Sequence, residues 1–114
     1  MTNLALNGNF LFDEELSLSS SPDPFTGSPQ LIGVLENIPV MLLVKNFTDQ
    51  TIFLSIDEEG TKGTTMIETE CFVLDCRGNK GNASNGGFPI GTSFFATVPE
   101  DGLGSVKISI VYAT

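Results

Sequence analysis

The segment SVKISIVY, residues 105–112, decides the fold class because its apolar and polar side chains alternate with a period of two. In an extended chain, successive side chains point to opposite faces of a sheet. The apolar face is expected to carry Val106, Ile108, Ile110 and Tyr112. The polar face is expected to carry Ser105, Lys107 and Ser109. The pattern therefore predicts a strand with one buried face, near the centre of a sheet.

Working back from this strand, the chain from residue 30 onward is a succession of short apolar runs separated by turn residues, with no helical period. The expected strands are residues 30–36, 40–45, 51–57, 65–74 (one bent strand or two short ones) and 93–98. The turn at residues 46–50 predicts that 40–45 and 51–57 form a hairpin. This pattern predicts an all-β protein, an antiparallel β-sandwich or jelly-roll-like domain.

The first 29 residues differ in composition from the rest. Ser and Pro crowd the stretch from Ser17 to Pro29, and proline cannot donate to a regular strand ladder. We therefore expect residues 1–29 to form an extended N-terminal arm or irregular segment, and residues 30–114 to form the sandwich domain. The apolar patch at residues 9–12 is either an edge strand or an anchor for the arm. Deletion of residues 1–29 is expected to leave a folded domain.

Length, charge and composition limit the class of protein further. A chain of 114 residues fits one domain. Its net charge of −9 repels phosphate backbones and anionic lipid surfaces, so we expect neither nucleic acid nor a membrane as a partner. The start of the chain lacks the basic and long apolar regions of a signal peptide, which predicts synthesis and folding in a cytoplasm.

The sequence contains no histidine, which removes the usual general base and every zinc site that uses imidazole. We expect no enzyme activity, no cofactor and no metal. The acidic residues Asp57, Glu58 and Glu59 lie in one predicted turn, where they fit solvated turn formers better than a catalytic carboxylate pair. The same turn is a weak calcium candidate because it lacks the spacing of an EF-hand loop.

The two cysteines, Cys71 and Cys76, are five residues apart around an apolar run. If this run is extended, their Cα atoms lie too far apart for a disulfide. We expect free thiols, and a bridge across a tight turn is the alternative. The triplets at Asn46 and Asn82 match a glycosylation acceptor, but ordinary turn asparagines explain both.

Surface contact is the remaining role, and aromatic and polar residues on the predicted flexible segments are its candidates. The segment 77–91 carries five Gly and three Asn and predicts a long exposed loop. The candidate contact residues are Phe10, Phe12, Phe25, Arg77, Lys80, Asn85 and Phe88. The phenylalanines are expected either to order against a neighbouring subunit or to pack back on their own domain.

Three stretches carry a resemblance to a known group of proteins. These are VMLLVKN at residues 40–46, IFLSID at residues 52–57 and VKISIVYA at residues 106–113. Over residues 40–114 the chain resembles small single-domain β-sandwich proteins of tailed-phage virions. In these proteins a hairpin with a Ser-x-Asp end precedes a Gly-rich loop and a final strand rich in Ile, Val and Tyr.

The resemblance implies a bacteriophage head decoration or cement protein, located in the virion, that binds between capsid subunits and stabilises the shell. Its partners would be the major capsid protein or other virion subunits, and copies of itself in a homo-oligomer for which a trimer is one candidate. The alternative is a carbohydrate- or receptor-binding module of a phage fibre or adhesin. The lack of Trp and the single Tyr count against a sugar site, which usually stacks a ring on its ligand.

Overall fold

The structure is a computed structural model that describes residues 10–76 and 88–113. The described residues form eight strands and no helix, and so they contain no helix that could span a membrane. The strands are β1 (Phe10–Ser19), β2 (Pro29–Val34), β3 (Pro39–Asn46), β4 (Ile52–Ser55), β5 (Gly63–Met66), β6 (Cys71–Asp75), β7 (Ser93–Thr97) and β8 (Ser105–Ala113).

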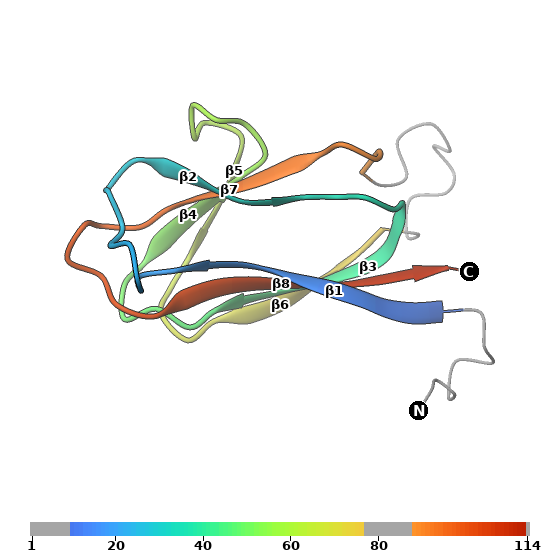
Figure 1. Cartoon of the computed structure of the whole chain (residues 1–114), viewed down its shortest axis with the longest axis horizontal. Helices are drawn as coiled ribbons and strands as arrows, with labels where there is room; N and C mark the ends of the chain where they lie inside the picture. The colour runs from blue at the N-terminus through green and yellow to red at the C-terminus, as the bar shows by residue number, and fades with distance from the viewer. Residues whose placement is uncertain (1–9, 77–87, 114) are drawn as a thin grey trace.

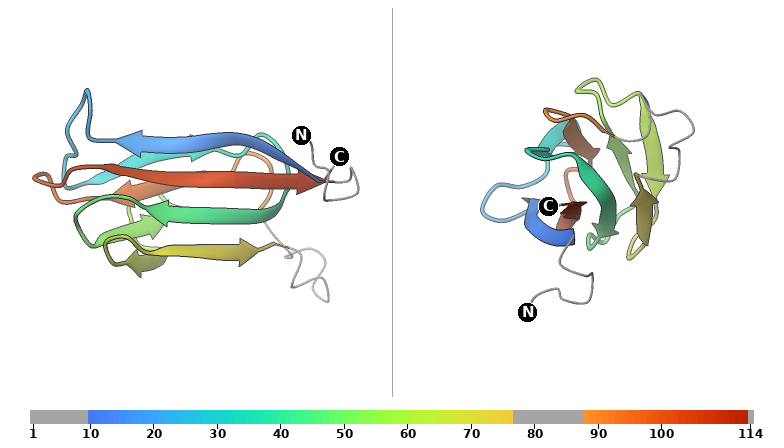
Figure 2. Two further views of the ribbon diagram at one scale, coloured as in Figure 1. Left: turned by 90° about the horizontal axis from the view of Figure 1, so that it is seen from below. Right: turned by 90° about the vertical axis from the view of Figure 1, so that its right-hand side faces the viewer.

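The strands make two four-stranded sheets packed face to face, as Figures 1 and 2 show. One sheet has the order β1-β8-β3-β6, and the other has the order β2-β7-β4-β5. All pairs are antiparallel. Successive strands along most of the chain lie in opposite sheets, which is the strand order of an eight-stranded jelly roll. The predicted antiparallel sandwich is therefore confirmed.

Alternation within each strand builds the core between the two sheets. In β8, Val106, Ile108 and Ile110 point inward and are at most 2% exposed, as the sequence predicted. The facing sheet contributes Phe94 and Ala96 of β7, which are equally buried. β8 lies between β1 and β3 (Figure 2, left), so its predicted central position is confirmed.

The predicted hairpin between residues 40–45 and 51–57 is wrong. β3 pairs with β6 and β8, while β4 pairs with β5 and β7 in the other sheet. The turn after Asn46 carries the chain from one sheet across to the other rather than back beside β3. Each strand thereby gains two flanking partners and one buried face. The segment 65–74 divides for the same reason, with β5 and β6 in different sheets.

Residues 10–29 belong to the sandwich, which corrects the domain boundary expected at residue 29. β1 pairs with β8 from Phe10 to Ser19, with one register shift between Phe12 and Glu15. Its Leu16 is 8% exposed, and Phe25 in the following loop is 2% exposed. Strand pairing along β8 and burial of these two side chains offset the poor strand propensity of the serines. The prolines of the loop, Pro22 and Pro24, follow β1 and do not interrupt its ladder.

Candidate functional site

Of the seven candidate contact residues, the structure describes the position of four, which lie on β1, the β1–β2 loop and the segment before β7. Phe10 and Phe12 lie in β1 at ladder positions opposite Ala113 and Val111. Arg77, Lys80 and Asn85 lie outside the described residues. Only Phe25 and Phe88 have described side chains.

Phe25 and Phe88 pack on their own domain, the second of the two roles considered for them. Phe25 is part of the hydrophobic core. Phe88 is half-buried and packs edge-on against Phe94, with the ring centroids 5.3 Å apart and the ring planes at 76°. This geometry is the favourable edge-to-face arrangement of two aromatic rings. Phe25 therefore offers no contact surface, whereas Phe88 keeps a partly exposed side.

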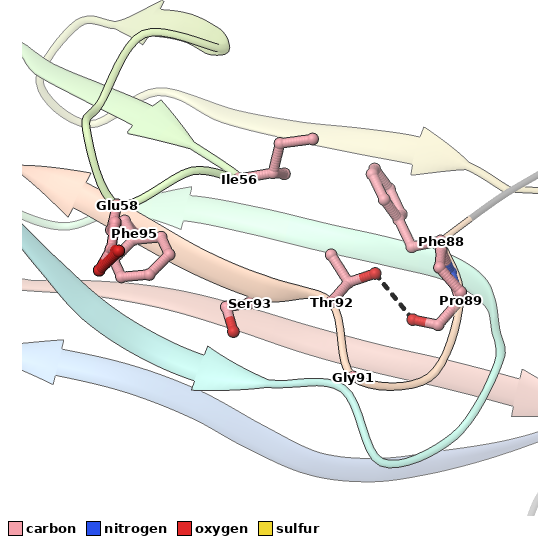
Figure 3. A pocket seen from close by; sticks show the side chains of 8 residues that line it. All are labelled: Ile56, Glu58, Phe88, Pro89, Gly91, Thr92, Ser93 and Phe95. Atoms are coloured by element: carbon pink, nitrogen blue, oxygen red, sulfur yellow. Dashed lines mark hydrogen bonds between the residues drawn. The ribbon is translucent and has the colours of Figure 1, made fainter.

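Phe88 lies beside an open depression of about 780 Å³ on the outer side of the β2-β7-β4-β5 sheet (Figure 3). The β4–β5 turn borders it on one side and the segment before β7 on the other. Its lining consists of Ile56, Glu58, Phe88, Pro89, Gly91, Thr92, Ser93 and Phe95. The Thr92 hydroxyl donates to the Pro89 carbonyl at 2.7 Å, which holds this wall in place.

The depression combines aromatic and polar groups. Two half-buried phenylalanine rings, a serine hydroxyl and the exposed Glu58 carboxylate converge on it. Because Glu58 is the single ionisable residue of the lining, a carboxylate pair for acid–base hydrolysis is not assembled there.

The acidic turn at Asp57 has a structural role. The Asp57 carboxylate accepts hydrogen bonds from the backbone N–H groups of Thr61 at 3.0 Å and Lys62 at 2.9 Å, and from the Thr61 hydroxyl. The Thr61 hydroxyl bond and the Lys62 backbone bond lower the pKa of Asp57 from 3.8 to about 2. Among the described residues, no three acidic or cysteine side chains cluster as metal ligands would.

The hydrogen bonds to the Asp57 carboxylate make the stability of the protein depend on pH. A carboxyl group whose pKa is lowered by folding contributes stability above its unfolded pKa of 3.8, and this contribution disappears as the pH falls toward about 2. We expect Asp57→Asn to melt at a lower temperature than the native chain at pH 6. We expect the difference to shrink toward zero at pH 2, when thermal unfolding is followed by circular dichroism. If the two melting temperatures differ by the same amount at pH 6 and pH 2, the ionised Asp57 carboxylate does not stabilise the turn.

Asn46, at the end of β3, is fully buried and joins the β3–β4 loop to the β5–β6 loop. Its amide group donates to the carbonyls of Gln50 at 3.0 Å and Ile67 at 2.9 Å. Its Oδ1 accepts from the backbone N–H of Thr48 at 3.0 Å and from the Thr48 hydroxyl at 2.7 Å. The side chain expected to be an ordinary turn asparagine is therefore an internal anchor. Because its amide is buried and hydrogen-bonded, the glycosylation triplet is inaccessible in the folded chain.

Three large apolar side chains are exposed at the end of the sandwich that Asn46 organises. Phe47, Ile67 and Leu103 are 51%, 62% and 65% exposed, and we call them the apolar end. They lie on the β3–β4, β5–β6 and β7–β8 loops, which meet at the left end of Figure 1.

The loops of the apolar end are fixed to one another. The Phe47 N–H donates to the Ser105 carbonyl at 2.8 Å, and the Leu103 N–H donates to the Asp49 carboxylate at 2.8 Å. Gly104 has φ +119° and lies so close to the chain at Phe47 that a Cβ atom there would be 2.2 Å from the Phe47 carbonyl oxygen. Our sequence interpretation missed this group. An aromatic residue in the middle of the polar turn at 46–50 was the available signal.

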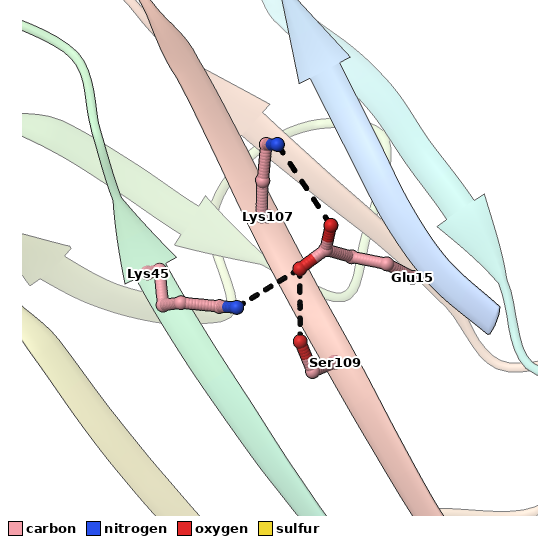
Figure 4. Close-up of polar contacts among 4 residues, drawn as sticks. All are labelled: Glu15, Lys45, Lys107 and Ser109. Atoms are coloured by element: carbon pink, nitrogen blue, oxygen red, sulfur yellow. Dashed lines mark hydrogen bonds and ion pairs between the residues drawn. The ribbon is translucent and has the colours of Figure 1, made fainter. Parts of the chain in front are cut away.

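A polar cluster occupies the outer face of the other sheet (Figure 4). The Glu15 carboxylate of β1 accepts from Lys45 Nζ and from the Ser109 hydroxyl, both at 2.9 Å, and lies 3.8 Å from Lys107 Nζ. The hydrogen bond from Lys45, followed by that from Ser109, lowers the pKa of Glu15. These side chains join β1, β8 and β3. Because they are partly exposed, solvent screens the ion pairs and their contribution is small.

The cysteines are free, as predicted, with Cys71 exposed and Cys76 buried. Burial raises the pKa of the Cys76 thiol, so it is a poor nucleophile.

The strand order of the two sheets defines a jelly-roll fold for the described residues. Comparisons with protein-family models, with curated proteins and with solved structures find no match to this chain.

Proposed function

We propose that this protein is a non-enzymatic structural protein of a virus particle, a decoration or cement protein that binds between capsid subunits and stabilises the shell. The observation that carries the proposal is the apolar end, where three exposed hydrophobic side chains stand on three cross-linked loops. Exposed apolar groups gathered at one place are typical of a protein-binding surface. Because hydrogen bonds already fix these loops, little conformational entropy is lost on binding.

Two further properties support a shell partner. The jelly roll is an architecture that recurs in viral capsid proteins, although it also occurs in lectins and other proteins, so the fold alone does not decide the function. Many copies on one lattice would add modest individual contacts into firm attachment of the whole layer. The net charge of −9 keeps the free copies soluble and directs the protein away from packaged nucleic acid.

The test is co-sedimentation of purified protein with purified capsids. Leu103→Asp places a charge in the apolar end, and we expect it to weaken capsid binding at least about tenfold, since an unpaired buried charge costs more than about 1.4 kcal/mol. Ile38→Asp is the matched control because Ile38 is 64% exposed and lies on the β2–β3 connection, away from the apolar end. We expect it to bind like the native chain.

Equal weakening by both variants, with both folded by circular dichroism, would contradict a binding role for the apolar end. Failure of the native chain to sediment with any capsid would contradict the shell proposal.

The depression beside Phe88 favours a second candidate, a carbohydrate- or receptor-binding module. Phe88 and Phe95 line it together with Ser93 and Glu58, and aromatic, hydroxyl and carboxylate groups are able to bind a sugar. Binding on a glycan array without co-sedimentation with capsids would favour this second function.

A further inference from the structure

The two sheets leave four edge strands, and three of them carry features that discourage pairing with another chain. β1 has a register shift between Phe12 and Glu15, and β2 begins with a proline and has a register shift after Leu31. β5 has four residues, begins with a glycine and is mostly exposed and polar. Bulges, prolines and very short strands are the usual means by which proteins protect sheet edges. The remaining edge, β6, has none of them.

β6 has the sequence CFVLD, with no lysine, proline or glycine and with five uninterrupted ladder positions against β3. The Asn46 N–H donates to the Glu70 carbonyl, and the Cys76 N–H donates to the Val40 carbonyl. Because hydrogen-bonded positions alternate along an antiparallel pair, the backbone groups of Phe72 and Leu74 face β3. Those of Cys71 and Val73 face away from the sheet, where no further strand of the described chain lies.

The side chains of β6 are also incompletely covered. Phe72 and Leu74 point toward the core but remain half-buried, because the sheet ends at this strand. On the outer face Val73 is 55% exposed and lies opposite the half-buried Leu43. An added strand would cover apolar surface on both faces of the sheet.

We propose that two copies of this chain pair through their β6 strands, antiparallel about a twofold axis at Val73, joining two four-stranded sheets into one of eight strands. In this register Val73 lies opposite Val73 of the second copy, and Phe72 lies opposite Leu74 of the second copy on the core side. Cys71 lies opposite Asp75 of the second copy, so no like charges meet across the axis. Each copy offers the other the same surface, which is the requirement of a closed twofold interface.

This register argues for a second copy over an unrelated peptide. When two copies of β6 pair, each residue meets a suitable neighbour in the other copy. Phenylalanine lies opposite leucine on one face, and valine lies opposite valine on the other. The inference does not rest on the proposed function, and it replaces the trimer considered from the sequence with a twofold pair.

The test is sedimentation velocity of the full chain over a range of concentrations at physiological ionic strength, where the repulsion between two acidic copies is screened. Val73→Asp places two carboxylates opposite each other across the axis. We expect it to raise the dimer dissociation constant at least about tenfold. Val34→Asp, on the edge strand β2 and 39% exposed, is the matched control with the same residue type and the same charge change. We expect it to dimerise like the native chain.

A mixture of two charge variants is the most direct test of pairing at Val73. Val73→Lys alone is also expected to dissociate, because two lysines then face each other. Mixing it with Val73→Asp is expected to restore a heterodimer, since the opposite charges meet at the axis. A native chain that stays monomeric at the highest concentration, or a mixture that stays monomeric, would overturn the proposal. Dimers weakened equally by Val34→Asp and Val73→Asp would also overturn it.

Discussion

A chain lacking residues 1–29 is expected not to fold. The truncation removes β1, which pairs with β8 along eight ladder positions, and leaves β8 as an unprotected edge strand. It also removes Leu16 and Phe25 from the core. Removal of one such buried side chain costs about 2–5 kcal/mol, so the combined loss is comparable with the roughly 5–15 kcal/mol that stabilises a typical domain. Circular dichroism and NMR amide dispersion of the truncated chain measure the outcome.

A point substitution tests the same feature without shortening the chain. Phe25→Ala is expected to lower the free energy of unfolding by about 3–5 kcal/mol in a urea titration. The control is Leu31→Ala, because Leu31 is 49% exposed and its loss is expected to cost less than about 1 kcal/mol. A well-dispersed NMR spectrum from the truncated chain, with little effect of Phe25→Ala, would show that these residues are an arm outside the domain.

Asn46→Leu is expected to lower the free energy of unfolding by about 3 kcal/mol or more. Leucine keeps the volume of the side chain but leaves the carbonyls of Gln50 and Ile67 and the N–H of Thr48 without their amide partner. Each buried group left without a hydrogen bond costs about 1–3 kcal/mol. Because the same amide holds two of the three loops of the apolar end, we expect capsid binding to weaken as well.

Thr48→Val provides the graded comparison in the same urea titration. Thr48 is 2% exposed, and its hydroxyl donates to Asn46 Oδ1. Valine removes this hydroxyl but keeps the backbone N–H that also donates to Asn46. The hydroxyl also accepts from the backbone N–H of Gln50 at 3.2 Å, so the expected loss is about 1–2 kcal/mol, less than that of Asn46→Leu. Equal losses for the two variants would contradict the central position of the Asn46 amide in the network.

Local pattern was sufficient to predict most of the strands but not their pairing. β7 and residues 105–110 of β8 alternate so regularly that their inward residues follow from the sequence, whereas the burial of Val111 breaks this alternation. The predicted hairpin failed because alternation defines which face is buried without defining which strand lies beside it. In a jelly roll the neighbours of β3 are β8 and β6, and both are distant in sequence.

The N-terminal region was misassigned because its Ser and Pro content was given more weight than its possible pairing with β8. Ser17 and Ser19 have low strand propensity, yet they pair with Lys107 and Ser105 of the most regular strand in the protein. Burial of Phe25 among prolines depends on the tertiary position of the loop, which no local pattern encodes. The depression and the apolar end each combine loops that are distant in sequence. The sequence therefore indicated only single residues of these surfaces, such as Phe88.

The central functional claim is that this jelly roll is a component of an assembled particle. Quantitative mass spectrometry of virus particles purified from the source of this chain tests it most directly. We expect this chain in the particles at a fixed ratio to the major capsid protein, unchanged by further purification. Particles that contain the capsid protein but not this chain would contradict the account.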